Sequence, residues 1–213
     1  MAEHYKIHFK ETLTGFKWLA TVSREDPALV PVFAFEEAIG YTCGTQKGLV
    51  TGDKDGVATA CVALEMCNWL YSQGKTVYGY LQGIYQKYGY HAWQNSGITV
   101  ANMGEVAKLF VPLFKDPNNR QYCQTIGRFK VNRVRDMKRP GYDSQLGKPN
   151  LPVGGSEMLT FYTDDVVMTF RPSGTEPKVK YYIEAVSKES NEAARKLAIE
   201  FEDAFLTLLG QKK

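Results

Sequence analysis

The sequence lacks the features that mark membrane, secreted and zinc-binding proteins. None of its apolar runs approaches the roughly 18 residues of a membrane-spanning helix, and polar residues rather than a signal-peptide core follow Met1. The cysteines form no CxxC pair and no zinc-type spacing with the three histidines. They are Cys43, Cys61, Cys67 and Cys123. We therefore expect a cytoplasmic protein with reduced cysteines and no membrane partner.

Strong charge is lacking as well. The chain has 26 basic and 23 acidic residues, and its net charge of +3 is too small to indicate a polyanionic partner by itself. It also has no internal repeat and no low-complexity segment. A chain of 213 residues that is 44% hydrophobic can bury a substantial core, in one large domain or two small ones.

Residues 170–178 read Phe-Arg-Pro-Ser-Gly-Thr-Glu-Pro-Lys and separate two β-branched and aromatic runs, 166–170 and 179–183. Both runs predict strands, so the segment between them predicts a tight loop, restricted by prolines and turned at a glycine. The loop gathers a guanidinium, two hydroxyls, an ammonium and backbone amides, and such a set of donors suits a phosphate. From the residues alone, a basic hairpin turn with solvated charges is equally compatible.

Two carboxylates directly follow a short apolar strand predicted over residues 30–34. Glu36 and Glu37 would be costly in a protein interior without partners, but at the carboxyl end of an α/β strand they would face a ligand crevice. The alternative is a helix N-terminus, where the helix dipole favours acidic residues.

A lysine and a small turn are further candidates. Lys54 lies in an Asp-Lys-Asp-Gly turn before an apolar helix predicted over residues 57–71, and that turn has the simpler interpretation of a helix cap. Thr14 and Gly15 form a turn that leads into a short helix. With the carboxylates, these residues would line one crevice of an α/β domain.

Periodicity predicts the other elements of the first half. Residues 5–10 alternate like a strand. The apolar positions of 57–71 and 76–88 predict helices with mostly buried faces, so we assign the aromatic residues of the second helix to a core. Gly89 ends that helix, and we place a domain boundary there.

The second half predicts a sheet with helices. A strand over 91–100, a helix from an Asn102 cap to Phe110 and an amphipathic helix over 190–209 flank several strands. Residues 127–136 alternate and predict one strand with a basic outer face. That face beside tyrosines would also suit RNA, but no RRM-type aromatic pair or KH-type loop accompanies it. We therefore expect a solvated face and no nucleic-acid partner.

Motifs in five places resemble those of the α-D-phosphohexomutases, which move a phosphate between two positions of one sugar through a bisphosphate intermediate. The motifs are Thr-Gly-Phe-Lys-Trp (14–18), Glu-Glu-Ala-Ile-Gly (36–40), Asp-Lys-Asp-Gly (53–56), Tyr-Gly-Tyr-His (88–91) and Arg-Pro-Ser-Gly-Thr-Glu-Pro-Lys (171–178). The fourth, with Arg135-Asp136 and the Gly-Tyr-Asp-Ser of 141–144, resembles the phosphoglucomutase-2/phosphopentomutase branch in particular.

This resemblance covers essentially the whole chain and implies its fold. Residues 1–89 would be the C-terminal part of the family's sugar-binding domain 3, an α/β partial domain with a mixed sheet and helices. Residues 90–213 would be the phosphate-binding domain 4, an α+β domain whose antiparallel sheet has helices packed on one face.

The resemblance also implies roles for the candidate residues. The sugar would be bound by Thr14, Gly15, Glu36 and Glu37. The non-transferred phosphate would be bound by Arg171, Ser173, Gly174, Thr175 and Lys178. Lys54 matches a lysine that points into the active cleft, and it is a candidate catalytic group or phosphate contact. The family reads Gly-Glu-x-Ser around Glu36, so Phe35 and Ala38 depart from the pattern and the preferred sugar, hexose or pentose, stays open.

Two parts of the family's machinery have no counterpart in this sequence. A Thr-x-Ser-His-Asn-Pro loop carries the phosphoryl group, an Asp-x-Asp-x-Asp-Arg loop holds Mg²⁺, and both belong to the first two domains. The resemblance thus implies that the missing N-terminal domains are partners and that Mg²⁺ binds through them, with no cofactor in this chain. We expect the chain to bind a sugar phosphate but, alone, not to act as an intramolecular phosphotransferase (isomerase). The alternative is a non-catalytic phosphosugar-binding or interaction module.

Overall fold

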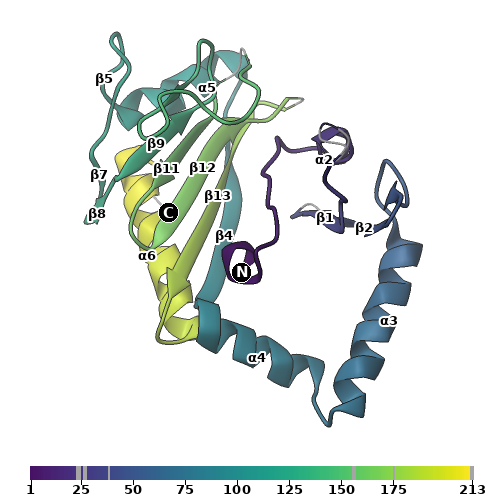
Figure 1. The fold of residues 1–213 in the computed structure, drawn as a ribbon. Helices are drawn as coiled ribbons and strands as arrows, with labels where there is room; N and C mark the ends of the chain where they lie inside the picture. Colours follow the sequence, from purple (N-terminus) through teal and green to yellow (C-terminus); the bar gives the residue numbers. More distant parts are fainter. Residues whose placement is uncertain (23–24, 26–27, 38, 155–156, 175, 212–213) are drawn as a thin grey trace. The chain divides into compact units, whose positions relative to one another are not determined.

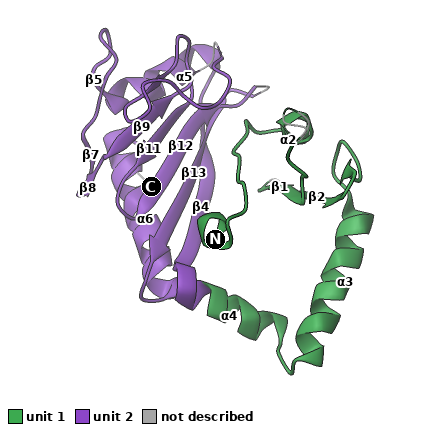
Figure 2. Ribbon diagram, viewed as in Figure 1, with its two compact units in different colours: residues 1–84 green, residues 85–213 purple. Residues whose placement is uncertain are grey.

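The computed structural model describes residues 1–22, 25, 28–37, 39–154, 157–174 and 176–211. The chain forms two compact units, residues 1–84 and 85–213 (Figures 1 and 2). The predicted class, a helix-and-sheet unit followed by an α+β unit with an antiparallel sheet, is confirmed. The domain boundary after Gly89 stays a prediction.

The first unit consists of short strands and helices. Its elements are α1 (Ala2–Tyr5), α2 (Phe16–Val22), β1 (Phe33–Glu36), β2 (Gly40–Thr45), β3 (Gly48–Leu49) and α3 (Gly56–Ser72). The three strands form an antiparallel sheet in the order β1-β2-β3, with Glu36 opposite Gly40. Helix α4 (Val77–Tyr88) follows α3 and continues into the second unit. The strand predicted over residues 30–34 corresponds to β1, which begins later than predicted, at Phe33.

The strand predicted over residues 5–10 is wrong. Helix α1 ends at Tyr5, Lys6 adopts a left-handed φ of 55°, and residues 7–13 have no regular structure. A strand needs a neighbour to satisfy its backbone hydrogen bonds, and no described strand pairs with this segment. Alternation alone therefore does not produce a strand here, and Ile7 and Phe9 stay exposed.

Helices α3 and α4 form as predicted, but their predicted burial is wrong. The Asp55 carboxylate caps α3 by accepting from the Ala58 amide at 2.9 Å, and the Thr76 hydroxyl accepts from the Gly79 amide at 3.0 Å. Leu70 is the one buried side chain among the described residues of α3, and α4 buries none. Apolar periodicity shows that a helix can bury a face, but it does not supply the surface that covers it.

We expect the backbone amides of α3 to exchange with solvent much faster than those of the C-terminal helix α6 (Asn191–Leu208). The two helices have similar lengths, 17 and 18 residues, but α3 buries one described side chain and α6 buries six. The free energy of local opening rises with the buried contacts that hold an element. Hydrogen–deuterium exchange of the intact chain measures the difference, and equal protection of the two helices would contradict it.

The second unit is organised around a six-stranded antiparallel sheet with the order β10-β9-β11-β12-β13-β4 (Figure 1). Its strands are β4 (Tyr90–Thr99), β9 (Arg133–Asp136), β10 (Tyr142–Asp143), β11 (Leu159–Tyr162), β12 (Val166–Pro172) and β13 (Lys178–Ser187). The remaining elements are α5 (Met103–Phe110), the 3₁₀ turn η1 (Val111–Leu113), β5 (Phe114–Asp116), β6 (Gln121–Tyr122), β7 (Thr125–Ile126) and β8 (Phe129–Lys130).

Helices α5 and α6 cover one face of this sheet, as predicted. The ring of Phe170 in β12 lies 4.7 Å from the ring of Phe110 in α5 and 5.1 Å from the ring of Phe205 in α6. Phe170 and Phe205 are fully buried. The cap predicted at Asn102 is present, since its side chain accepts from the Gly104 amide, and the Ser190 hydroxyl, which the sequence analysis did not identify as a cap, accepts from the Ala193 amide.

The single strand predicted over residues 127–136 is wrong. Gly127, with a φ of 56°, turns the chain between β7 and β8, and β9 begins only at Arg133. The predicted solvated face is wrong in part, because Arg135 is 7% exposed and Asp136 1% exposed. Alternation continues through a tight turn as readily as along a strand, so it did not reveal the break.

Candidate functional site

Three predicted site residues of the first unit are in contact. The Glu36 carboxylate accepts a hydrogen bond from the Gly15 amide at 3.2 Å through Oε2 and pairs with the Lys54 ammonium at 2.8 Å through Oε1. Its side chain is 14% exposed, and that of Lys54 is 41% exposed. A carboxylate so placed is desolvated on one side and held by two donors, while the lysine still faces solvent. We call these three residues the Glu36 cluster.

The local fold explains how the cluster forms. Glu36 is the last residue of β1, where the hairpin to β2 begins. The loop that carries Lys54 is tied to β2 because the Asp55 amide donates to the Tyr41 carbonyl at 2.8 Å. The Asp55 carboxylate also caps α3. The cap interpretation of the Asp-Lys-Asp-Gly turn is therefore confirmed for Asp55, and it places Lys54 beside Glu36.

The other candidates of the first unit flank this cluster in sequence. Thr14 is exposed and directly precedes Gly15, and Glu37 is exposed and directly follows Glu36. Ala38, which departs from the family pattern, lies outside the described residues.

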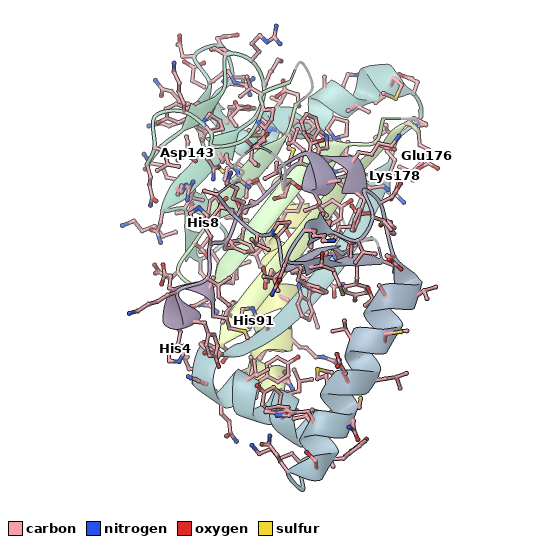
Figure 3. All side chains as sticks on the ribbon, turned by 45° about the vertical axis from the view of Figure 1, so that its right-hand side comes forward. His4, His8, His91, Asp143, Glu176 and Lys178 are labelled. Atoms are coloured by element: carbon pink, nitrogen blue, oxygen red, sulfur yellow. The ribbon has the colours of Figure 1, made fainter. Side chains whose placement is uncertain are left out.

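The predicted phosphate loop connects β12 to β13. Ser173 is 7% exposed, and its amide donates to the Lys178 carbonyl at 2.7 Å, while the Lys178 amide donates to the Glu176 carbonyl at 2.7 Å. Figure 3 shows Glu176 and Lys178 together at this end of the hairpin. Gly174 is exposed, and Thr175 lies outside the described residues. Fewer backbone amides are free than the sequence predicted, because those of Ser173 and Lys178 pair inside the loop.

Arg171 lies at the base of this loop, opposite Lys180 on β13. Its Nη2 donates to the Tyr182 hydroxyl at 3.1 Å, and its guanidinium lies 5.5 Å from the centre of the Tyr182 ring. Its Nε is buried and has no hydrogen-bond partner among the described residues. Because a buried donor without a partner is costly, Arg171 retains hydrogen-bonding capacity that an anion would satisfy.

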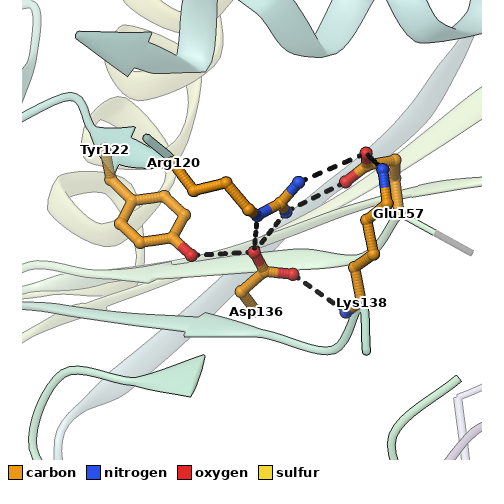
Figure 4. A network of polar contacts seen from close by, with 5 residues as sticks. All are labelled: Arg120, Tyr122, Asp136, Lys138 and Glu157. Carbon is orange, nitrogen blue, oxygen red and sulfur yellow. Dashed lines mark hydrogen bonds and ion pairs between the residues drawn. The ribbon is translucent and has the colours of Figure 1, made fainter. Parts of the chain in front are cut away.

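A second polar cluster was missed by the sequence analysis (Figure 4). Asp136 accepts from the Arg120 Nε at 2.8 Å, the Tyr122 hydroxyl at 2.7 Å and the Lys138 amide at 2.9 Å. Arg120 Nη2 also contacts Asp136, and it reaches Glu157 at 3.1 Å. Lys138 Nζ pairs with Glu157 as well. We call these five residues the Asp136 network.

The Asp136 network lies beside an open cavity of about 570 Å³ that Tyr142 also lines. Burial raises the pKa of Tyr122, and its hydrogen bond to Asp136 raises it further. Burial would raise the pKa of Glu157, but hydrogen bonds from Arg120 and Lys138 outweigh it and hold this pKa below its usual value. Two cations and two carboxylates thus balance, so the network has the character of a structural brace. An acidic residue directly after a basic run was its only signal in the sequence.

Metal ligands do not gather in the described part of the chain. There, no three His, Cys, Asp or Glu side chains lie close enough to hold a metal ion. All four cysteines are free, and burial raises the pKa of Cys123 to about 11. None of the described helices is long and apolar enough to cross a membrane.

Comparison with protein families agrees with the fold and the motifs. A family model described as phosphoglucomutase/phosphomannomutase, alpha/beta/alpha domain III, matches residues 1–88. The model of the C-terminal domain of the same family matches residues 128–200. The chain belongs to this family, the α-D-phosphohexomutases, and corresponds to the C-terminal part of its members.

Three individual relatives show how much of a whole protein the chain matches. Phosphopentomutase from Homo sapiens is 36% identical over 202 residues, which are 92% of this chain and 32% of the relative. Glucose 1,6-bisphosphate synthase from Homo sapiens is 39% identical over 186 residues, which are 84% of this chain and 29% of the relative. A probable phosphomannomutase from Haemophilus influenzae is 33% identical, covering 99% of this chain and 38% of the relative. The chain thus spans about a third of the length of these curated relatives.

Proposed function

We propose that this chain binds the sugar ring and the non-transferred phosphate of a sugar phosphate. In this proposal it is the C-terminal portion of a phosphomutase that moves phosphate between two positions of glucose or ribose through a bisphosphate intermediate. The sugar contacts are Thr14, Gly15, Glu36 and Glu37. The phosphate contacts are Arg171, Ser173, Gly174, Thr175 and Lys178.

The observation that carries the proposal is the Glu36 cluster. Gly15, Glu36 and Lys54 belong to three separate motifs, and the contacts of Glu36 bring them together. A helix-terminus role for Glu36 would need no lysine and no amide from a distant turn. A carboxylate with free lone pairs accepts hydrogen bonds from sugar hydroxyls, and a neighbouring ammonium donates to sugar or phosphate oxygens.

The phosphate end of the proposal rests on the loop between β12 and β13. The guanidinium of Arg171 offers bidentate donors, Lys178 offers a point charge, and the exposed Gly174 leaves the backbone accessible. The buried and unpartnered Nε of Arg171 supports an anionic ligand at this position. Phosphoryl transfer depends on aligning the reacting groups, which is worth about 7–11 kcal/mol in favourable cases. Since the chain would bind only one end of its substrate, we expect no transfer by the chain alone.

The experiment is a titration of the isotope-labelled chain with glucose 6-phosphate or ribose 5-phosphate, followed by amide NMR. We expect shifts of the Gly15, Glu36 and Gly174 amides, because these residues belong to the proposed contacts. Free glucose and free ribose are the controls for the phosphate, and inorganic phosphate is the control for the sugar. The proposal is wrong if the largest shifts lie on α3 or α6, or if neither sugar phosphate shifts these amides.

A non-catalytic phosphosugar-binding module would give the same titration. The two alternatives separate when the upstream domains of a relative are supplied. Mutase turnover on glucose 1-phosphate or ribose 1-phosphate supports the enzyme portion, and its absence from a folded, ligand-binding assembly supports the module.

A further inference from the structure

We propose that Gly40 is a positioning residue for Lys54. Because Gly40 has no side chain, the methylene groups of Lys54 (its stem) can lie directly against the backbone at this position. Gly40 and Glu36 face each other across the hairpin from β1 to β2. Lys54 reaches Glu36 by passing over Gly40. The consequence for ligand binding rests on the proposed function, whereas the geometry stands without it.

The distances at Gly40 show how completely the lysine fills this space. A Cβ atom on Gly40 would lie 2.6 Å from Cε, 2.7 Å from Cδ and 2.8 Å from Cγ of Lys54. Carbon atoms in contact prefer separations of about 3.5–4.0 Å. Any side chain at position 40 therefore collides with three consecutive carbons of Lys54. We expect the lysine side chain to shift and its 2.8 Å contact with Glu36 to weaken.

Backbone conformation does not require this glycine. Gly40 lies in the regular strand β2 and does not have a positive φ. The three atoms nearest to its Cβ position all belong to the Lys54 side chain. At Gly44, in the same strand, a Cβ would instead meet the backbone oxygen of Pro31 at 1.6 Å. Gly40 therefore leaves space for one flexible side chain, whereas Gly44 lets the backbone of Pro31 approach closely.

A similar arrangement occurs at the candidate phosphate loop. A Cβ on Gly97 in β4 would lie 2.5 Å from Cε of Lys178 and 2.9 Å from the backbone oxygen of Val179. Each lysine that the sequence assigned to a site thus lies over a glycine of a neighbouring strand. A lysine whose methylene groups lie against the backbone has fewer positions open to its ammonium than a lysine that extends into solvent. Gly40 gives the cleaner test, because no backbone atom is among its nearest contacts.

The test is a double-mutant cycle on the full chain. Gly40→Ala is made in three backgrounds: wild type, Lys54→Ala and Lys54→Met. The readouts are the urea midpoint of unfolding of the first unit and the chemical shift of the Gly15 amide, which donates to Glu36. Lys54→Met keeps most of the stem without the charge, and Lys54→Ala removes both.

We expect Gly40→Ala to lower the midpoint in the wild-type and Lys54→Met backgrounds, and to leave it unchanged or raise it in Lys54→Ala, where the space is empty. The Gly15 amide should shift on Gly40→Ala in the wild-type background and not in Lys54→Ala. An equal fall of the midpoint in all three backgrounds would overturn the proposal, because the added methyl group would then be colliding with something other than Lys54.

A glucose 6-phosphate titration separates the geometry from the proposed function. If Lys54 contacts the ligand, Gly40→Ala should weaken binding about ten-fold, the scale of one charged hydrogen bond. The same substitution in the Lys54→Ala background should then have no further effect on affinity. If Gly40→Ala lowers the midpoint only where residue 54 has a long side chain, and affinity is unchanged, Gly40 does leave space for Lys54. The same result would overturn the ligand contact of Lys54.

Discussion

Replacement of Asp136 by alanine is expected to lower the free energy of unfolding of the second unit by about 3–5 kcal/mol, the usual cost of breaking a buried ion pair by removing one partner. Asp136 is 1% exposed and accepts from Arg120, Tyr122 and the Lys138 amide. Its loss leaves these donors without their acceptor and removes the negative charge that compensates Arg120. Urea unfolding followed by circular dichroism measures the change.

Two control variants identify the cause. Asp136→Asn keeps the size of the side chain and one acceptor oxygen, so it should cost less than the alanine variant. Asp165→Ala removes an exposed carboxylate between β11 and β12 and should change stability by no more than about 0.5 kcal/mol. A loss below about 1 kcal/mol for Asp136→Ala would show that the Asp136 network is not a structural brace.

The sequence could not show which residues form this network. Arg120 lies 16 residues from Asp136 and 37 residues from Glu157. Asp136 and Glu157 come together because β9 and β11 pair in register, with Leu159 opposite Asp136. Arg120 and Tyr122 reach them from a separate hairpin, at β6. Periodicity reports which residues share a face of one element, but it does not report which elements become neighbours.

Local features were predicted more successfully. The caps by Asp55 and Asn102 depend on contacts within one turn of helix, so the sequence contains all the residues they need. The hairpin around residues 172–178 was predicted for the same reason, since its two strands are neighbours in sequence. The burial of α3 was predicted wrongly because it depends on a covering surface that periodicity does not specify.

The candidate site lies between these cases. The sequence identified Gly15, Glu36 and Lys54 as one crevice, and the structure brings them into contact. It did not reveal that the amides of Ser173 and Lys178 are used within their own loop. Whether a backbone amide is free depends on the exact turn, and several turns are compatible with the same prolines and glycine.

The expected effect of Arg171→Ala on ligand binding is a loss of about 10- to 150-fold in affinity for glucose 6-phosphate or ribose 5-phosphate. A hydrogen bond to a charged group contributes about 1.5–3 kcal/mol, and each 1.4 kcal/mol corresponds to ten-fold. Arg171 combines a charge at the base of the loop with a buried Nε that has no partner among the described residues. Isothermal titration calorimetry measures the affinity, and circular dichroism checks that the variant is folded.

Three matched variants make this expectation specific. Arg171→Lys keeps the charge but loses the planar fork, so its affinity should lie between those of wild type and Arg171→Ala. Tyr182→Phe removes the hydroxyl that accepts from Arg171 at 3.1 Å and should weaken binding less than Arg171→Ala does, because the ring still supports the guanidinium. Arg195→Ala removes an exposed charge from α6 and should leave affinity unchanged. If Arg195→Ala and Arg171→Ala weaken binding equally, the ligand responds to net charge alone and the loop is not its phosphate site.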